Sequence, residues 1–178
     1  MEVIEPGQDR KVAALRSSFH VHIFLLYGGR MNKEYFDLAF IEAEKAFNNN
    51  EVPIGAIIVK DGIVIASAYN HKEEDMCATS HAEILAIQEA SKKLNNWRLD
   101  GCSIYVTLDP CPMCASAIKQ ARISHVYSAL NNSDPNNLFI LENIFKTDNV
   151  NPMVEFESNL DSERSKELLN SFFEKQRN

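Results

Sequence analysis

Two short motifs constrain this 178-residue chain more than any other feature. The first is His81-Ala82-Glu83, and the second is Pro110-Cys111-Pro112-Met113-Cys114. One imidazole and two thiolates supply three of the four positions of a tetrahedral zinc site, and the fourth stays open for water, as in a catalytic centre. Glu83 follows the histidine by two residues, where its carboxylate can move a proton without binding the metal. The motifs therefore predict a hydrolytic site in which His81, Cys111 and Cys114 bind zinc and Glu83 is catalytic.

Both motifs are expected at the first turn of a helix. Apolar residues recur at helical spacing after Glu83, which predicts a helix that runs to about Lys93. Pro112 suits the first position of a second helix, with Cys111 at its cap. The partial positive charge at a helix N-terminus favours a thiolate over a thiol. Two helix N-termini are thus expected to face one metal ion.

Each motif has a simpler interpretation when it is taken alone. A lone histidine is usually structural, and a C-x-x-C pair can be a redox pair, a disulfide or half of a four-cysteine zinc site. A redox pair would explain neither His81 nor Glu83, and Cys77 and Cys102 stand too far apart in the sequence to form a second such pair. The joint pattern therefore favours a zinc hydrolase. The two other cysteines are expected to be packed or idle, in the reducing conditions of a cytoplasmic protein.

The segment from Glu51 to Arg122 resembles the bacterial tRNA adenosine deaminases of the cytidine deaminase superfamily. The stretches that match are Glu51-Val52-Pro53-Ile54-Gly55-Ala56, Asn70, His81-Ala82-Glu83, Asn96-Trp97-Arg98-Leu99, Tyr105-Val106-Thr107-Leu108 and Pro110-Cys111-Pro112-Met113-Cys114. The resemblance implies a hydrolytic deaminase, with one zinc ion per chain, that converts adenosine to inosine at the wobble position of a tRNA anticodon. It also implies a homodimer that binds a tRNA anticodon stem-loop, with no DNA and no membrane as partner.

The resemblance also implies four substrate-binding residues, each with a structural alternative. Asn70 matches an asparagine that hydrogen-bonds the sugar of the target nucleotide, although it also suits a turn after a strand. Ile54 is a candidate wall for the base and equally a candidate core residue. Phe172 and Phe173 resemble paired aromatics that hold the anticodon loop, although a helix that packs two rings on the core would show the same pair.

Two features oppose an RNA substrate. The formal net charge is −7, and the 130–137 loop has neither the glycine nor the lysine that the family usually shows there. A basic rim could still bind RNA, and its candidates are Lys119, Arg122, Lys146, Lys175 and Arg177. The second hypothesis is therefore a deaminase of a free nucleobase or nucleoside, such as guanine, cytosine or adenosine. A non-catalytic zinc-stabilised subunit is disfavoured, because it would not need Glu83.

The rest of the pattern predicts one α/β domain over residues 31–178, preceded by an N-terminal extension, residues 1–30, outside the fold. Expected strands are 54–60, 63–69, 103–108, 123–130 and 153–157, and expected helices begin near 33, 81, 112, 138 and 162. This order predicts a three-layer α/β/α architecture, and the resemblance implies the cytidine-deaminase-like fold with a mixed five-stranded sheet. The apolar run from Phe19 to Tyr27 is too short to span a bilayer.

Overall fold

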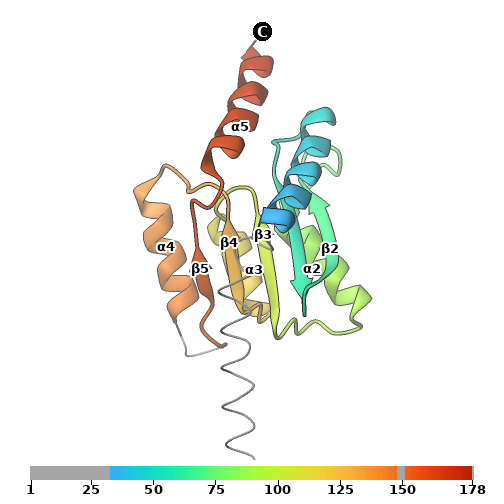
Figure 1. Cartoon of the computed structure of the whole chain (residues 1–178), viewed down its shortest axis with the longest axis vertical. Helices are drawn as coiled ribbons and strands as arrows, with labels where there is room; N and C mark the ends of the chain where they lie inside the picture. Colours follow the sequence, from blue (N-terminus) through green and yellow to red (C-terminus); the bar gives the residue numbers. More distant parts are fainter. Residues whose placement is uncertain (1–32, 148–150, 178) are drawn as a thin grey trace, which may run out of the picture. The chain divides into compact units, whose positions relative to one another are not determined.

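A mixed five-stranded sheet lies at the centre of the fold (Figure 1). The computed structural model describes residues 33–147 and 151–177, and one compact unit begins at Tyr35. The strand order is β2-β1-β3-β4-β5. The strands are β1 (Gly55–Lys60), β2 (Ile63–Tyr69), β3 (Cys102–Val106), β4 (His125–Ser128) and β5 (Glu155–Glu157). Strand β1 is antiparallel to β2 and β3, whereas β3, β4 and β5 are parallel, so the predicted mixed sheet is confirmed.

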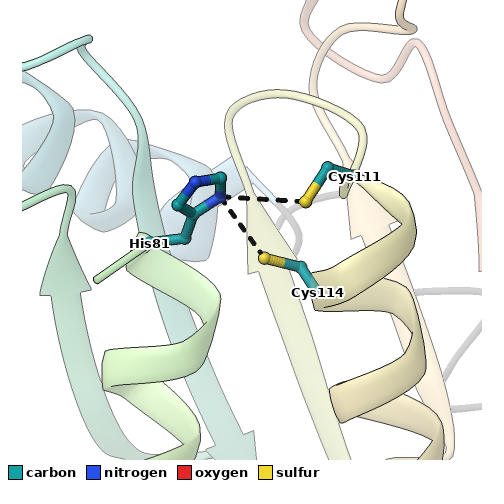
Figure 2. A group of neighbouring side chains, drawn as sticks. All are labelled: His81, Cys111 and Cys114. Atoms are coloured by element: carbon teal, nitrogen blue, oxygen red, sulfur yellow. Dashed lines mark hydrogen bonds between the residues drawn. The ribbon is translucent and has the colours of Figure 1, made fainter. Parts of the chain in front are cut away.

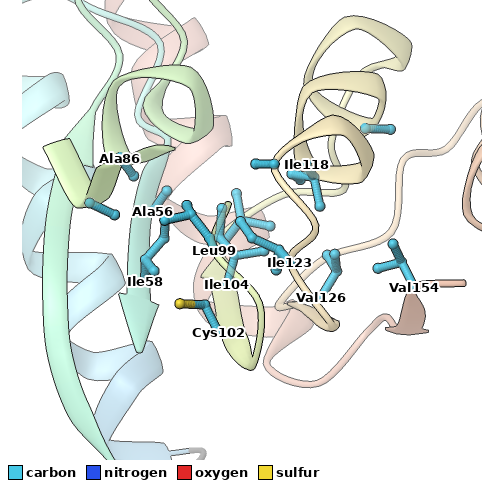
Figure 3. Packing of buried hydrophobic residues seen from close by; sticks show 14 of the residues in the cluster. Ala56, Ile58, Ala86, Leu99, Cys102, Ile104, Ile118, Ile123, Val126 and Val154 are labelled. Carbon is cyan, nitrogen blue, oxygen red and sulfur yellow. The ribbon is translucent and has the colours of Figure 1, made fainter. Parts of the chain in front are cut away.

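Helices cover both faces of this sheet, which confirms the three-layer architecture. Helices α2 (Ala82–Lys93), α3 (Pro112–Gln120) and α4 (Pro135–Lys146) share one buried apolar cluster with the sheet (Figure 3). The helix of residues 33–48 and Leu168 of α5 (Ser162–Arg177) share a second cluster with the opposite face. None of the helices in the described part of the chain is long and apolar enough to cross a membrane.

Strand β1 contributes side chains to both apolar clusters. Ala56 and Ile58 belong to the cluster under α2 and α3, whereas Ile57 and Val59 belong to the cluster under the helix of residues 33–48. Alternate side chains of a strand point to opposite faces, so a continuous apolar run is what a centrally buried strand requires. Gly55 starts this strand because a Cβ there would lie 2.0 Å from the carbonyl oxygen of Ala39.

The structure corrects several predicted boundaries: β3 ends at Val106 rather than at residue 108, β5 begins at Glu155 rather than at residue 153, and β4 and α4 differ as well. Strand β4 ends at Ser128 and not at residue 130, because the Ser128 carbonyl accepts a hydrogen bond from Leu160 and the Ala129 carbonyl accepts one from Asp161, in the segment before α5. Helix α4 begins at Pro135, before the expected residue 138, because Asp134 caps it by accepting a hydrogen bond from the Asn136 amide. The predicted extension of residues 1–30, with its apolar run, lies outside the described residues.

Candidate metal and catalytic site

Helix α2 begins where it was predicted to begin, and His81 is its N-cap. The histidine backbone is extended, with φ −81° and ψ 151°, directly before the first helical residue. The N–H of Ala82 donates to Oδ1 of Asn70 at 3.0 Å, and the side-chain amide of Asn70 donates to the Val52 carbonyl at 3.1 Å. Asn70 is buried. It therefore ties the end of β2 to the start of α2, and this holds the histidine in place.

Helix α3 positions the two cysteines in the same way. Cys111 is the N-cap, with φ −72° and ψ 166°, and Pro112 fills the first turn. Cys114 lies one turn further on and is fully buried, whereas Cys111 is partly exposed. A proline at this position loses no helical hydrogen bond, and its fixed φ suits the helix. Both thiols therefore point from the N-terminus of α3 toward the N-terminus of α2 (Figure 2).

The three side chains are spaced to hold a metal ion. Their ligand atoms all lie within 4.8 Å of one another. Nδ1 of His81 is 3.5 Å from Sγ of Cys114 and 3.8 Å from Sγ of Cys111 (Figure 2). Metal–sulfur bonds near 2.3 Å and metal–nitrogen bonds near 2.0 Å in a tetrahedron separate nitrogen and sulfur ligands by roughly 3.5 Å. The observed spacing matches that geometry.

The two thiols share a proton in a way that suits metal binding. The Cys114 thiol donates a hydrogen bond to Cys111, and the backbone amides of Cys114 and Met113 also face Cys111, so the pKa of Cys111 falls to about 5. The pKa of Cys114 is raised, because it is the donor of that pair and because it is buried. A metal cation that binds both sulfur atoms displaces this proton, since thiolates are the ligating form.

Glu83 is a buried carboxyl next to this group. Its side chain is 3% exposed, on the second residue of α2. Burial raises its pKa and the negative charge of the Cys111 thiolate adds to the rise, whereas a backbone hydrogen bond and His81 oppose it. A carboxyl whose pKa is raised holds a proton more readily than an ordinary carboxylate, which suits a group that must both take and return a proton as a general acid and base.

The two aromatic residues of the predicted pair, Phe172 and Phe173, lie in different environments. Phe172 is buried and packs edge-on against Phe47, with ring centroids 5.9 Å apart. Phe173 is 47% exposed. The alternative of core packing thus describes Phe172, and only Phe173 presents its ring to solvent. Ile54 is partly buried against the core, and its carbonyl accepts the Asn70 amide N–H at 3.1 Å.

The predicted basic rim is wrong for Lys119. This lysine is buried, and its ammonium group donates to the carbonyl oxygens of Phe145 and Thr147 at the end of α4. It therefore links α3 to α4. Lys146 forms an ion pair with Glu142 on the same helix, and the Lys175 ammonium group lies over the Phe47 ring. Both of these predicted rim residues therefore already have a partner within the protein.

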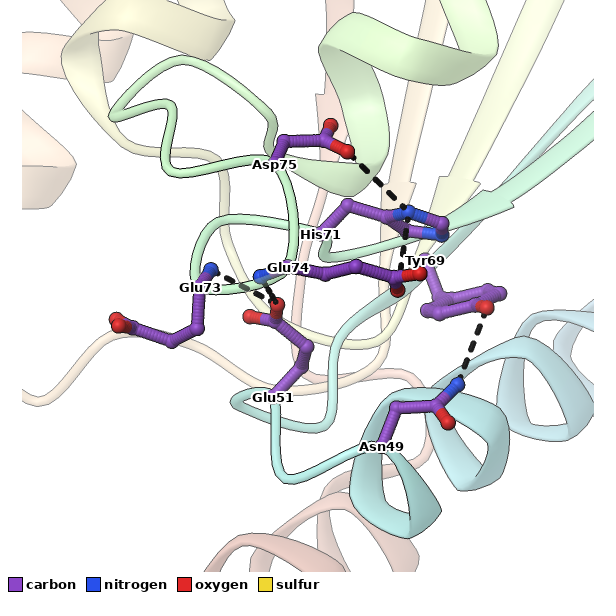
Figure 4. Close-up of polar contacts among 7 residues, drawn as sticks. All are labelled: Asn49, Glu51, Tyr69, His71, Glu73, Glu74 and Asp75. Atoms are coloured by element: carbon purple, nitrogen blue, oxygen red, sulfur yellow. Dashed lines mark hydrogen bonds and ion pairs between the residues drawn. The ribbon is translucent and has the colours of Figure 1, made fainter.

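Two buried carboxylates near the site were not identified from the sequence. Glu51 is 1% exposed and accepts hydrogen bonds from the amides of Glu73 and Glu74, both at 2.8 Å (Figure 4). It holds the loop between β2 and α2. In this loop Nδ1 of His71 lies 3.6 Å from a Glu74 oxygen, and the His71 ring packs against Tyr69 at an interplanar angle of 40°. Glu51 belongs to a stretch that matches the deaminases, but nothing local shows that its carboxylate is buried.

Asp109 is the second of these carboxylates. It is buried between β3 and the cysteine helix, and its carboxylate accepts the Asn132 amide at 3.1 Å and the Ser158 hydroxyl at 2.5 Å. Its own amide donates to the Leu130 carbonyl at 2.8 Å. Asp109 therefore ties the cysteine motif to the loop after β4 and to the segment before α5. In the sequence, only its position two residues before Cys111 indicates that Asp109 lies near the site.

Comparison with known proteins agrees with this geometry. Residues 31–177 match the MafB19-like deaminase family. The tRNA-specific adenosine deaminase of Aquifex aeolicus (strain VF5) is 45% identical over 150 residues, which cover 83% of this chain and 98% of that protein. A solved structure from a study of A-to-I editing by tRNA:A34 deaminases at the wobble position of transfer RNA is 36% identical, with a TM-score of 0.69, and covers 77% of this chain and 99% of that one.

Guanine deaminases share the fold as well. The structure of guanine deaminase from Bacillus subtilis is 32% identical, with a TM-score of 0.55, and covers 70% of this chain and 83% of that one. The match to the Aquifex protein is higher in identity and spans almost all of that protein. The chain therefore belongs to the MafB19-like deaminase family and to the family of tRNA-specific adenosine deaminases.

Proposed function

We propose that this protein is a zinc-dependent hydrolytic deaminase that converts adenosine to inosine at the wobble position of a tRNA anticodon. One observation carries the proposal: the buried Glu83 carboxyl lies beside a His81–Cys111–Cys114 group spaced to hold a metal ion. The substrate is taken from the names of two relatives, the tRNA-specific adenosine deaminase of Aquifex aeolicus and the tRNA:A34 deaminase structure.

His81, Cys111 and Cys114 would hold one zinc ion per chain. Two thiolates and an imidazole are a donor set that zinc favours, and three protein ligands leave a position open. When bound, zinc supplies the Lewis acidity that makes a water molecule nucleophilic near neutral pH. The chain itself contributes the fixed ligand positions at two helix N-termini and the buried carboxyl beside them.

Glu83 performs the proton transfers. Its carboxylate takes one proton from the attacking water and delivers it to the ring nitrogen next to the carbon that bears the amine. The water oxygen bonds to that carbon, Glu83 takes the second proton, and it delivers this one to the exocyclic nitrogen, which leaves as ammonia. Adenosine and water thus become inosine and ammonia, and Glu83 returns to its starting state.

Several residues would hold the substrate. We infer that Asn70 hydrogen-bonds the sugar of the target nucleotide while its amide oxygen continues to hold the start of α2. Ile54 would form an apolar wall for the base. Of the aromatic pair, the exposed Phe173 is the ring that can stack on a loop base, and Phe172 would support it from the core. Single-stranded anticodon bases are open to such contacts.

We also infer that the enzyme acts as a homodimer and in the cytoplasm. The homodimer follows from the resemblance to the bacterial enzymes, and the cytoplasm follows from a tRNA substrate and from thiols that must stay reduced. Analytical ultracentrifugation of the zinc-loaded protein measures its oligomeric state. A fully active protein that stays monomeric at micromolar concentration would contradict the homodimer.

The deciding experiment is a substrate panel. The full chain is incubated with an anticodon stem-loop that carries adenosine at the wobble position, and separately with free adenosine, cytidine, cytosine and guanine. Mass spectrometry of the nucleosides should show inosine only in the RNA. Ammonia release from guanine with no inosine in the RNA would instead assign the chain the activity named for the Bacillus subtilis relative that is 32% identical.

A further inference from the structure

An exposed tryptophan with two arginines lies at the end of α2 and α3 that is remote from the metal-ligating group. Trp97 is 57% exposed. The guanidinium carbons of Arg98 and Arg122 lie 4.7 Å and 5.7 Å from the centroid of its ring. Helix α2 has 12 residues and begins beside His81, so this surface lies roughly 18 Å from the histidine along the helix axis. We call Trp97, Arg98 and Arg122 the Trp–Arg platform.

The backbone holds this platform rigidly. Leu99 is fully buried, and its amide donates to the Ala121 carbonyl at 2.7 Å, so the loop after α2 is fixed to the end of α3. The Arg98 amide donates to Oδ1 of Asn96 at 3.0 Å, which orders the same loop. A surface that is already ordered loses little conformational entropy when a ligand binds.

Arg122 occupies a backbone position that disfavours its side chain. It follows the C-cap of α3 with φ +63°, a place where helices usually have glycine. The other non-glycine residues with positive φ in the described ranges are asparagine or aspartate, except for Met76. Nε of Arg122 is also buried without a hydrogen-bond partner in the described structure. Strain and an unpaired donor at one residue indicate that its side chain serves a function.

The charges of the platform are available to an anion. Neither Arg98 nor Arg122 forms an ion pair with a carboxylate in the part of the chain that the structure describes. Lys92 is exposed in the last turn of α2, and the loop that carries Trp97 has one acidic residue, Asp100. Basic residues at helix C-termini also complement the helix dipole, but this does not account for an exposed indole. A guanidinium fork matches a phosphate, and an indole face can stack on a base.

We propose that the Trp–Arg platform is a second RNA contact, which binds the sugar–phosphate backbone of the same RNA whose target base occupies the metal site. The proposal takes its RNA from the proposed function. A span of roughly 18 Å corresponds to roughly five nucleotides of a stacked strand. The platform would therefore contact nucleotides outside the catalytic pocket and give a local positive surface to a chain of net charge −7.

The first test uses the only tryptophan of the chain, which is Trp97. The full chain with Glu83→Gln, which binds RNA without turnover, is titrated with the anticodon stem-loop while tryptophan fluorescence and the anisotropy of labelled RNA are recorded. The two signals should saturate together. If anisotropy reports binding and the fluorescence of Trp97 does not change, the RNA does not reach the platform and the proposal is wrong, while the proposed function stands.

The second test removes charge from the platform. Arg98→Gln and Arg122→Gln should each weaken RNA binding and lower the slope of log Kd against log salt by about 0.7 to 0.9. Lys166→Gln is the matched control, because it removes one exposed positive charge from α5 and should leave the slope unchanged. Equal slopes for all three variants would reject the proposal. So would a change of oligomeric state in the platform variants with unchanged RNA affinity, which would identify a protein interface.

The third test separates binding from structural support. Arg122→Gly relieves the positive φ, so its melting temperature should equal or exceed that of the native protein. Its affinity for the stem-loop should nevertheless fall by about the same factor as in Arg122→Gln. A variant that binds RNA as tightly as the native chain would show that the Arg122 side chain has no part in RNA binding.

Discussion

Glu83 is the residue at which the proposed activity can be separated from the fold. Glu83→Gln removes the proposed proton carrier but keeps the shape of the side chain, and it leaves the three candidate ligand atoms unchanged. We expect about one zinc ion per chain, an unchanged melting temperature, and a loss of roughly 100- to 10,000-fold in kcat, which is the usual contribution of a general acid and base. Metal analysis and single-turnover kinetics measure these values. Activity within tenfold of the native enzyme would mean that another group carries the proton.

Cys77 offers a second prediction at the residue scale. Its thiol is exposed, lies 3.3 Å from the Thr79 hydroxyl, and has a pKa lowered to about 7, first by that hydrogen bond and next by the Thr79 amide. The thiolate fraction therefore rises from about one tenth at pH 6 to about nine tenths at pH 8, and alkylation by iodoacetamide should follow it. Burial raises the pKa of Cys102, so that thiol should not react.

Mass spectrometry of the zinc-loaded protein should thus find one alkylated thiol, that of Cys77. Removal of zinc with a chelator should make Cys111 and Cys114 reactive as well, so that three thiols are then modified. Thr79→Val is the matched variant, because it keeps the shape and removes the hydroxyl. Its alkylation midpoint should move upward toward the ordinary cysteine value. A native midpoint already at that value would contradict the role of Thr79.

At the scale of elements, the structure depends on hydrogen bonds between segments that are distant in the sequence. Asp109→Ala leaves the Asn132 amide and the Ser158 hydroxyl without their buried acceptor. We expect a loss of about 1 to 3 kcal/mol in the free energy of unfolding. Asp109→Asn should lose less, since an amide can accept from Asn132 and donate to Ser158. Denaturant unfolding of both variants measures the difference.

Ser158→Ala is the control for that prediction, because it removes one of the two hydrogen bonds and leaves the carboxylate bound to the loop after β4. Its loss should lie between zero and that of Asp109→Ala. Equal stability of all three variants and the native protein would show that these contacts do not support the loop.

The KM for RNA should rise in Asp109→Ala more than kcat falls, because the loop after β4 moves while Glu83 stays in place.

Local patterns in the sequence predicted most of the elements and the three side chains that lie close enough together to hold a metal ion, but not these long-range contacts. The apolar period and the Pro112 position indicated both helix N-termini, and the predicted N-cap position of Cys111 is confirmed. Asp109 and Lys119 find partners far along the chain, which no local pattern specifies. The Phe172–Phe173 pair was ambiguous for a related reason: adjacent helical residues point about 100° apart, so the packing of α5 decides which ring faces the core.

At the scale of the whole molecule, we propose that residues 31–178 form the deaminase domain and that residues 1–30 lie outside it. The deaminase family match begins at residue 31, and the compact unit begins at Tyr35. The residues of the two apolar clusters and of the candidate metal-binding group all lie at Tyr35 or later in the chain. The first thirty residues contain four basic and three acidic groups, so their removal changes the formal net charge only from −7 to −8.

A chain that starts at Met31 should therefore melt within about 2 °C of the full chain, a difference that corresponds to less than about 1 kcal/mol for a domain of this size. Its kcat/KM on the anticodon stem-loop should stay within about twofold, since loss of one net positive charge changes long-range attraction to RNA only slightly at physiological salt. Thermal unfolding and initial rates, measured for both chains with equal zinc content, test the proposal. A melting temperature lower by many degrees would show that residues 1–30 stabilise the domain. An unchanged melting temperature with a much lower kcat/KM would assign them a role in RNA binding.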